Sequence, residues 1–217
     1  VEEQEGEELP ALRDFDPGAG TATRPGVGGE GATNSARGGR APQTAEAWRA
    51  AHRRLYEHLC ATTQDQPDAT LEDLQPLYQA VAHGCQAGLT EEARAKIFRD
   101  RILRGKEGYS LHKLGAFGSH LGAVACLFKQ PWSELLPGIK ESGQGWLLNE
   151  AAMRLRGLGR LTEALEPIRA SQGMCVKQKD WKEAANRGSN VAELELTLGD
   201  VAEAVMDAEQ SVVYADR

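Results

Sequence analysis

The sequence predicts an all-α protein built from stacked helical hairpins. Near the C-terminal end a phrase occurs twice, as AAMRLRGLGRLTEALEPI at 151–168 and as VAELELTLGDVAEAVMDA at 191–208. Each copy has an apolar helical stripe, then Leu-Gly, a short turn and a second apolar stripe. A recurrence with a period of 40 residues is typical of an array of helical hairpins. No segment shows convincing strand alternation, which is the second reason for an all-α prediction.

Composition narrows the classes of function. The chain has 217 residues, of which 41% are hydrophobic and 6% aromatic, and this fits a core of Leu, Ala and Val. The net charge of −7 argues against a nucleic-acid backbone as the main ligand, because that ligand needs a basic surface. We expect no signal peptide, and no apolar run approaches the roughly 20 residues that span a bilayer. We therefore expect neither a nucleic-acid nor a membrane partner.

Residues 1–42 differ in composition from the rest of the chain. Five of the first eight residues are Glu, and the segment is rich in Gly and Pro with almost no aliphatic side chains. Such a segment buries too little apolar surface to offset the entropy of ordering, so we predict a disordered linker. The alternative for PGVGGEG at 25–31 is a phosphate-binding loop, but that motif needs a preceding strand and a Gly-Lys-Ser/Thr ending, which this segment lacks. We predict a helical repeat domain over 43–217.

The first predicted helix starts with Thr44 as its N-cap and runs to about Ala61. Its expected buried face repeats at helical spacing and consists of Trp48, Ala51, Leu55 and Leu59. The segment 64–70 predicts a turn, and Thr70 with Asp73 resembles a capping box for a helix that ends near Gly88.

Thr90 is the expected N-cap of the next helix, which carries Ala93, Ile97 and Ile102 on one face. The segment GKEGYS at 105–110 breaks this helix. A further helix should start at Ser110 and continue to about Leu127.

The helical pattern is weakest over 131–144, where we expect only a short helix with Pro131 in its first turn. It recovers over 146–158, and helices then follow over 161–176, 180–198 and from 201 to the end.

The two copies of the phrase resemble tetratricopeptide repeats. That pattern places small residues where the two helices approach and a glycine in the turn between them. The positions that match are Leu148, Ala152, Gly159, Leu161 and Ala164 in one unit, and Ala192, Gly199, Val201 and Ala204 in the next. Gly188 departs from the pattern, which has a large residue at that position. The resemblance covers roughly 71–217 and implies a right-handed solenoid that binds a protein or peptide partner.

Stretches such as PLYQAVAHGCQAG also resemble the helical sensor regions of bacterial signal-transduction NTPases of the MalT-like kind. This resemblance implies an alternative function, a ligand-sensing regulatory segment whose partners include other domains of its own chain. No NTPase motif lies within these 217 residues. Because the chain begins at Val1 and stops at Arg217 within the repeat pattern, we expect a fragment of a longer protein, with its repeat domain truncated at the C-terminal end.

In tetratricopeptide arrays the ligand lies in a groove lined by the first helix of each hairpin. The groove positions of the pattern fall on these residues: Trp146, Asn149, Met153, Arg156, Asn186, Ser189, Glu193 and Leu196. The lysine and asparagine of the family's carboxylate clamp are replaced by Asn149 and Met153, so we do not expect the chaperone tails that bind that clamp.

The sequence shows no catalytic constellation. Its histidines form no metal-binding motif, and His112 and His120, eight residues apart, lie too far apart to share a metal without further ligands. Glu91 and Glu92 suit the dipole of a helix start better than a catalytic role. The cysteines lie in apolar helical runs, which predicts reduced structural thiols and a reducing, cytoplasmic compartment. The locally basic run at 49–58 is interpreted as a solvated helix face.

The sequence therefore predicts an interaction scaffold without intrinsic catalysis, cofactor or metal.

Overall fold

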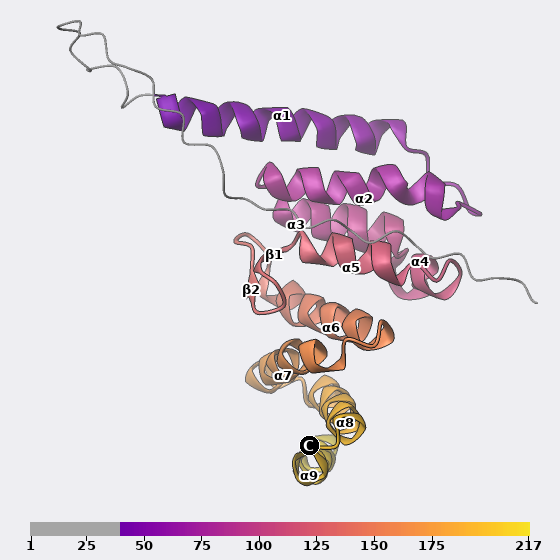
Figure 1. Cartoon of the computed structure of the whole chain (residues 1–217), viewed down its shortest axis with the longest axis vertical. Helices are drawn as coiled ribbons and strands as arrows, with labels where there is room; N and C mark the ends of the chain where they lie inside the picture. The colour runs from indigo at the N-terminus through magenta and orange to yellow at the C-terminus, as the bar shows by residue number, and fades with distance from the viewer. Residues whose placement is uncertain (1–39) are drawn as a thin grey trace, which may run out of the picture. The chain divides into compact units, whose positions relative to one another are not determined.

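The computed structural model describes residues 40–217, which belong to the unit Gly39–Arg217; most of the expected linker lies outside the described residues. In Figure 1 the helices of this unit follow one another in chain order, and neighbours along the chain pack together. The longer helices are α1 (Arg40–Thr62), α2 (Leu71–Gln86), α5 (Phe117–Ala125), α6 (Glu141–Gly157), α7 (Leu161–Gln178), α8 (Trp181–Leu198) and α9 (Val201–Ala215). The short elements are α3 (Thr90–Glu92), the π-helix η1 (Ala93–Ile102), the 3-10 turn η2 (Gly105–Glu107), α4 (Tyr109–His112), β1 (Phe128–Gln130) and β2 (Glu134–Leu135). The described region is thus mostly helical, as the sequence predicts.

Helix α1 packs on α2 through a face that includes only part of the predicted one, since Leu59 packs against the first apolar cluster. It begins at Arg40, so Thr44 lies inside the helix and is not its N-cap. Trp48 and Leu55 are 59% and 46% exposed, whereas Tyr56 is buried. A Cβ atom on Gly84 of α2 would lie 3.1 Å from the ring of Tyr56, so the absence of a side chain there allows the close approach of the two helices.

The start of α2 is as predicted. The Oγ1 atom of Thr70 accepts a hydrogen bond from the backbone N–H of Asp73, and the Asp73 carboxylate accepts one from the backbone N–H of Thr70. This reciprocal pair is the predicted capping box, with Asp in place of Glu.

The segment after α2 departs from a regular α-helix. Thr90 is buried, the residue before it is the N-cap, and Thr90 itself does not cap the helix. From Ala93 the chain forms a π-helix, whose wider turn places Ala93, Phe98 and Ile102 on one buried face. These buried positions are four or five residues apart, about one residue more than the turn of an α-helix. In a sequence, apolar residues at this spacing fit an α-helix as well as a π-helix, so the pattern alone does not distinguish the two.

The prediction of one continuous helix over 110–127 is wrong. It is divided into α4 and α5 because the intervening backbone turns at Gly115, which has a φ of +61°. The short helix expected after Pro131 is also wrong. In its place β1 and β2 form an antiparallel hairpin whose turn contains Pro131. Lys129 forms an ion pair with Glu134 across this hairpin, and the ring of Trp132 packs on that of Phe128 with centroids 5.6 Å apart.

The C-terminal helices lie close to the predicted boundaries, except that α6 begins at Glu141, earlier than the expected start at 146. Gly159 and Gly199 end α6 and α8 at φ values of +74° and +94°, a left-handed conformation in which glycine has no steric penalty. Buried apolar side chains of the described region form two clusters. The first joins α1–α6, and the second is centred on α6, α7 and α8.

Candidate interaction surfaces

The two C-terminal hairpins, α6–α7 and α8–α9, repeat the same contacts in space. Ser171 of α7 donates a hydrogen bond of 2.6 Å to the backbone oxygen of Gly145 on α6. Forty residues later, Ser211 of α9 donates one of 2.8 Å to the backbone oxygen of Ala185 on α8. Ala164 and Ala204 are buried at equivalent points of α7 and α9. The repeat seen in the sequence is therefore a repeat of helix packing, and it allows residues to be compared in pairs.

The predicted groove residues come from the first helix of each of these hairpins. Asn149, Met153 and Arg156 of α6 are half-buried, whereas Asn186 and Glu193 of α8 are exposed. The Arg156 guanidinium forms an ion pair with the Glu193 carboxylate at 2.5 Å, which shows that α6 and α8 approach each other on this side.

The remaining predicted positions are engaged in packing or exposed. Ser189 Oγ lies 3.1 Å from Ser211 Oγ, so its polar atom is directed toward α9. Leu196 is 59% exposed. Trp146 is half-buried, and its ring contacts Phe98 and lies under the Arg94 guanidinium, at centroid distances of 6.0 and 5.6 Å. Trp146 thus joins α6 to η1.

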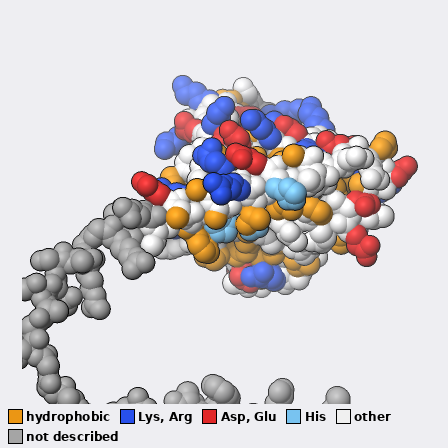
Figure 2. Space-filling view, turned by 90° about the horizontal axis from the view of Figure 1, so that it is seen from above, with side chains coloured by type: hydrophobic (Ala, Val, Ile, Leu, Met, Phe, Trp, Pro, Cys, Tyr) orange, Lys and Arg blue, Asp and Glu red, His pale blue; other side chains and the backbone are white. Residues whose placement is uncertain are grey.

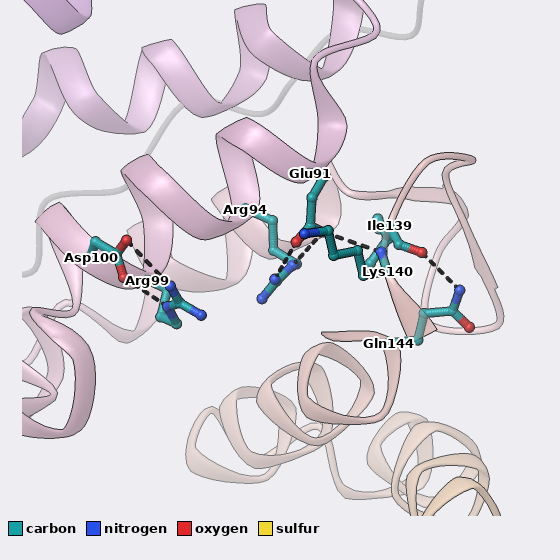
Figure 3. Close-up of polar contacts among 7 residues, drawn as sticks. All are labelled: Glu91, Arg94, Arg99, Asp100, Ile139, Lys140 and Gln144. Carbon is teal, nitrogen blue, oxygen red and sulfur yellow. Dashed lines mark hydrogen bonds and ion pairs between the residues drawn. The ribbon is translucent and has the colours of Figure 1, made fainter. Parts of the chain in front are cut away.

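The contacts around Arg94 fix the start of α6 against α3 and η1 (Figure 3). The Glu91 carboxylate accepts hydrogen bonds from the Arg94 guanidinium at 2.7 and 3.0 Å and from the backbone N–H of Lys140 at 3.2 Å. The pKa of Glu91 lies below its ordinary value, mainly because the carboxylate accepts hydrogen bonds from Arg94. A Cβ atom on Gly143 would lie 2.7 Å from the Arg94 guanidinium, so this position favours glycine. Glu91 therefore has a structural role here.

An apolar groove lies between α8 and α9. It has a volume of about 290 Å³, and we call it the α8/α9 groove. Its walls are Ala192, Glu193, Leu196, Val201, Ala204, Val205 and Ala208. Leu196, Val201 and Val205 are each more than half exposed, at 59%, 56% and 53%. Exposed apolar side chains gathered in this way make the groove a candidate contact surface for another element. Two of these walls, Glu193 and Leu196, are among the groove positions predicted from the sequence, whereas the contribution of Val201 and Val205 from α9 was not predicted.

A buried carboxylate distinguishes the second hairpin from the first. Glu195 of α8 is fully buried, at the position that Leu155 occupies in α6. Its Oε1 atom forms an ion pair with Arg169 of α7, whereas its Oε2 atom has no hydrogen-bond partner. Burial, and then the neighbouring Asp207 of α9, raise the pKa of Glu195, and Arg169 opposes this shift. The sequence offers no signal for this site, since the position reads only as a helical one.

Two histidines that are 31 residues apart meet between α1 and α2. The Nδ1 atoms of His52 and His83 lie 2.8 Å apart, so one ring must donate and the other accept a hydrogen bond. Partial burial and then the nearby His52 lower the pKa of His83. His52 also packs on Trp48, with ring centroids 4.5 Å apart. Sequence reasoning looked for histidine pairs within one helix and missed this one.

His120 is buried between η1 and α6. Its ring packs edge-on against Phe98, and its Nε2 atom lies 3.2 Å from the Glu150 carboxylate without good hydrogen-bond geometry. Burial lowers the pKa of His120, and the neutral form of its ring is therefore favoured. His112 lies in the separate helix α4, so the two histidines do not share a helix face.

No group of three or more metal-ligating side chains gathers within the part of the chain that the structure describes. The cysteines are unpaired; Cys85 and Cys175 are buried, and Cys60 and Cys126 are half-buried. Burial raises the pKa of the Cys85 thiol to about 12, so it is protonated and unreactive at neutral pH. Within 40–217, no helix is both long enough and apolar enough to span a membrane.

The face over α1 carries charges of both signs among apolar side chains (Figure 2). Arg49, Arg53 and Arg54 are exposed, as expected for a solvated helix face. Trp48 and Arg49 also line a hollow of about 660 Å³ against the segment Leu136–Gly138.

Comparisons with protein-family models, with curated proteins and with solved structures find no match to this chain.

Proposed function

We propose that this protein is an interaction scaffold built from tetratricopeptide-like helical hairpins arranged as a right-handed solenoid. The observation that carries this proposal is the recurrence, forty residues apart, of the serine-to-carbonyl contacts of Ser171 and Ser211. Hairpins that repeat the same packing form arrays whose stability comes from contacts between neighbours and whose extended faces are available to partners.

The side of α6 and α8 that carries Arg156 and Glu193 is the proposed peptide-binding face. Asn186 is exposed, and the Arg156–Glu193 pair joins the two helices on this side. This face is polar and of mixed charge, which fits a peptide held by hydrogen bonds and ion pairs. The same face would serve the alternative function, a regulatory segment of a larger signal-transduction NTPase.

A peptide-display selection against the full chain tests this function. Peptides recovered from a random library are synthesised, and their dissociation constants are measured for the wild type, for Asn186→Arg and for Ala170→Arg. Ala170 is the matched control because it is exposed on α7, away from the proposed face. We expect Asn186→Arg to weaken binding about tenfold or more, since a bulky cation then occupies the face. Failure to enrich any peptide, or equal binding to all three proteins, would overturn the proposal.

A further inference from the structure

The α8/α9 groove is open, whereas the equivalent groove of the preceding hairpin is filled. Subtracting the forty-residue period from Val201 and Val205 gives Leu161 and Leu165 of α7. These two side chains are half-buried and pack in the second apolar cluster. Val201 and Val205 are instead 56% and 53% exposed. The difference lies in what covers the two grooves.

Helix α8 covers the first groove. It contributes Val191, Leu194 and Leu198 to the cluster that contains Leu161 and Leu165. These three positions follow the spacing i, i+3 and i+7, which places them on one face of a helix. A helix that fills the α8/α9 groove in the same way must present aliphatic side chains at that spacing.

Charge distinguishes the helix that fits the second groove from α8 itself. On the first hairpin, Arg169 of α7 pairs with Glu195 of α8. If Val191 is position i of the covering helix, Glu195 is position i+4. The position equivalent to Arg169 on α9 is Glu209, which is exposed. The charge is therefore reversed, and a helix packed on α9 needs a basic residue at i+4.

We propose that the α8/α9 groove binds an amphipathic partner helix with branched aliphatic residues at i, i+3 and i+7 and a basic residue at i+4. This inference rests on the proposed scaffold function and names the chemistry of one of its partners. A second copy that packs α9 against α9 fits less well, because the exposed Glu209 would meet an acidic helix and not the basic residue that the groove favours.

The structure supplies the probe for the test. A fluorescein-labelled peptide with the sequence 181–198, capped at both ends, carries the aliphatic face of α8. It is made with the native Glu195 and with Glu195→Lys. We expect the Lys peptide to bind the full chain about two- to fivefold more tightly than the Glu peptide in fluorescence anisotropy, the range of an exposed ion pair. Against a Glu209→Lys chain this order should reverse.

Matched variants of α9 locate the binding site. Val205→Lys places a charge in the apolar groove and should weaken the Lys peptide about tenfold or more. Met206→Lys is the control: Met206 is 62% exposed, and its counterpart Glu166 stays exposed on α7, outside the covered face. Equal losses in the two variants, or no reversal with Glu209→Lys, would overturn the proposal.

Two further measurements separate the remaining outcomes. If sedimentation shows that the chain dimerises and that Val205→Lys makes it monomeric, the occupant is a second copy and the proposal is wrong. Glu193 borders both the α8/α9 groove and the proposed peptide-binding face, so the comparison uses peptides whose binding Asn186→Arg abolishes. These peptides should keep their affinity for Val205→Lys. If they bind but the α8-derived peptide does not, only the present inference fails, and the scaffold function stands.

Discussion

The region α6–α9 and the region α1–α5 are both helical, yet their helices are held together differently. In α6–α9 the contacts recur: the serine bonds of Ser171 and Ser211 and the glycine turns at Gly159 and Gly199 are each forty residues apart. In α1–α5 the corresponding contacts occur once. The Arg101 guanidinium bonds to the backbone oxygens of Cys60 and Thr63 at 2.9 and 2.6 Å, which ties η1 to the end of α1.

The loop between α1 and α2 shows the same reliance on single contacts. Arg104 donates hydrogen bonds to the backbone oxygens of Gln66 and Pro67, and the Tyr109 hydroxyl donates one of 2.8 Å to that of Ala69. From this difference we expect the region α6–α9 to tolerate the loss of one contact locally, since in the proposed solenoid a defect would reach mainly the neighbouring helices. A region built on unique contacts depends on each of them.

The largest expected effect lies in the N-terminal region, at Tyr109. Tyr109 is almost fully buried, and the Arg104 guanidinium lies 3.5 Å from the centre of its ring. Tyr109→Ala should lower the free energy of unfolding by about 3–5 kcal/mol, through the cavity and the lost contacts. Urea denaturation measures this, and hydrogen exchange should show the loop 63–69 opening.

Tyr109→Phe is the matched control because it removes only the hydroxyl. It should cost about 1 kcal/mol, the usual net value of a hydrogen bond. If Tyr109→Ala cost no more than Tyr109→Phe, the ring would not support the loop, and the contrast between the two regions would lose its clearest example.

The next effect is smaller and confined to the repeat region. Ala164 is fully buried at the contact between α6, α7 and α8. Ala164→Leu should cost about 1–3 kcal/mol, because a larger side chain overpacks this contact. Hydrogen exchange should increase within 143–198 and stay unchanged in 44–62. Ala170→Leu, at an exposed position of α7, should have little effect; a neutral Ala164→Leu would show that the predicted repeat register is wrong.

Some features of the fold could be predicted from the sequence, and others could not. The helices α6–α9 and the turns between α6 and α7 and between α8 and α9 were predictable because the glycine signals at Gly159 and Gly199 are local and recur. The hairpin β1–β2 was not, since strands of two and three residues carry no alternation that can be recognised. The π-helix was missed because a spacing of four to five residues between apolar positions fits both kinds of helix.

The candidate site was predicted only in part. The eight groove positions lie on α6 and α8, and Arg156 and Glu193 meet. The packing of Trp146 on Phe98, the burial of Glu195 and the meeting of His52 with His83 each depend on which helices are neighbours in space. A single sequence does not contain that information. The peptide-binding role of the predicted groove stays a prediction.

Glu195 offers a change that should stabilise the protein. Leu155 fills the equivalent position of the first hairpin and is fully buried, whereas Glu195 brings a carboxylate into the same environment with one oxygen unpaired. Glu195→Leu should raise the free energy of unfolding by about 1–2 kcal/mol, since replacing a buried ion-pair partner with a packed apolar side chain is often favourable. Arg169 is half exposed and remains solvated. Thermal and urea denaturation check this result.

The pH dependence of the same variant tests the reason. Because burial raises the folded-state pKa of Glu195 above its ordinary value of 4.5, the folded state holds a proton more tightly than the unfolded state. The wild type should therefore gain stability as the pH falls from 7 toward 5, and Glu195→Leu should lack this gain. A lower stability of Glu195→Leu at all pH values would mean that the ion pair with Arg169 outweighs the burial of the carboxylate.

The smallest expected effect compares the two hairpins directly. Ser171 is fully buried and Ser211 nearly so, and each donates a hydrogen bond from α7 or α9 to the backbone oxygen of the preceding helix. Ser171→Ala and Ser211→Ala should each lower the free energy of unfolding by about 0.5–1.5 kcal/mol.

The Ser171 variant should lower it more, because α8 packs on α7 and a defect there affects two helix contacts, whereas the Ser211 variant affects one. A double variant should show additive losses, since the two sites share no partner. Ser211 Oγ also lies 3.1 Å from Ser189 Oγ, so both variants are compared in a Ser189→Ala background. Equal losses there would indicate that α9 is covered as fully as α7 in solution, and a larger Ser211 loss would contradict the equivalence of the two hairpins.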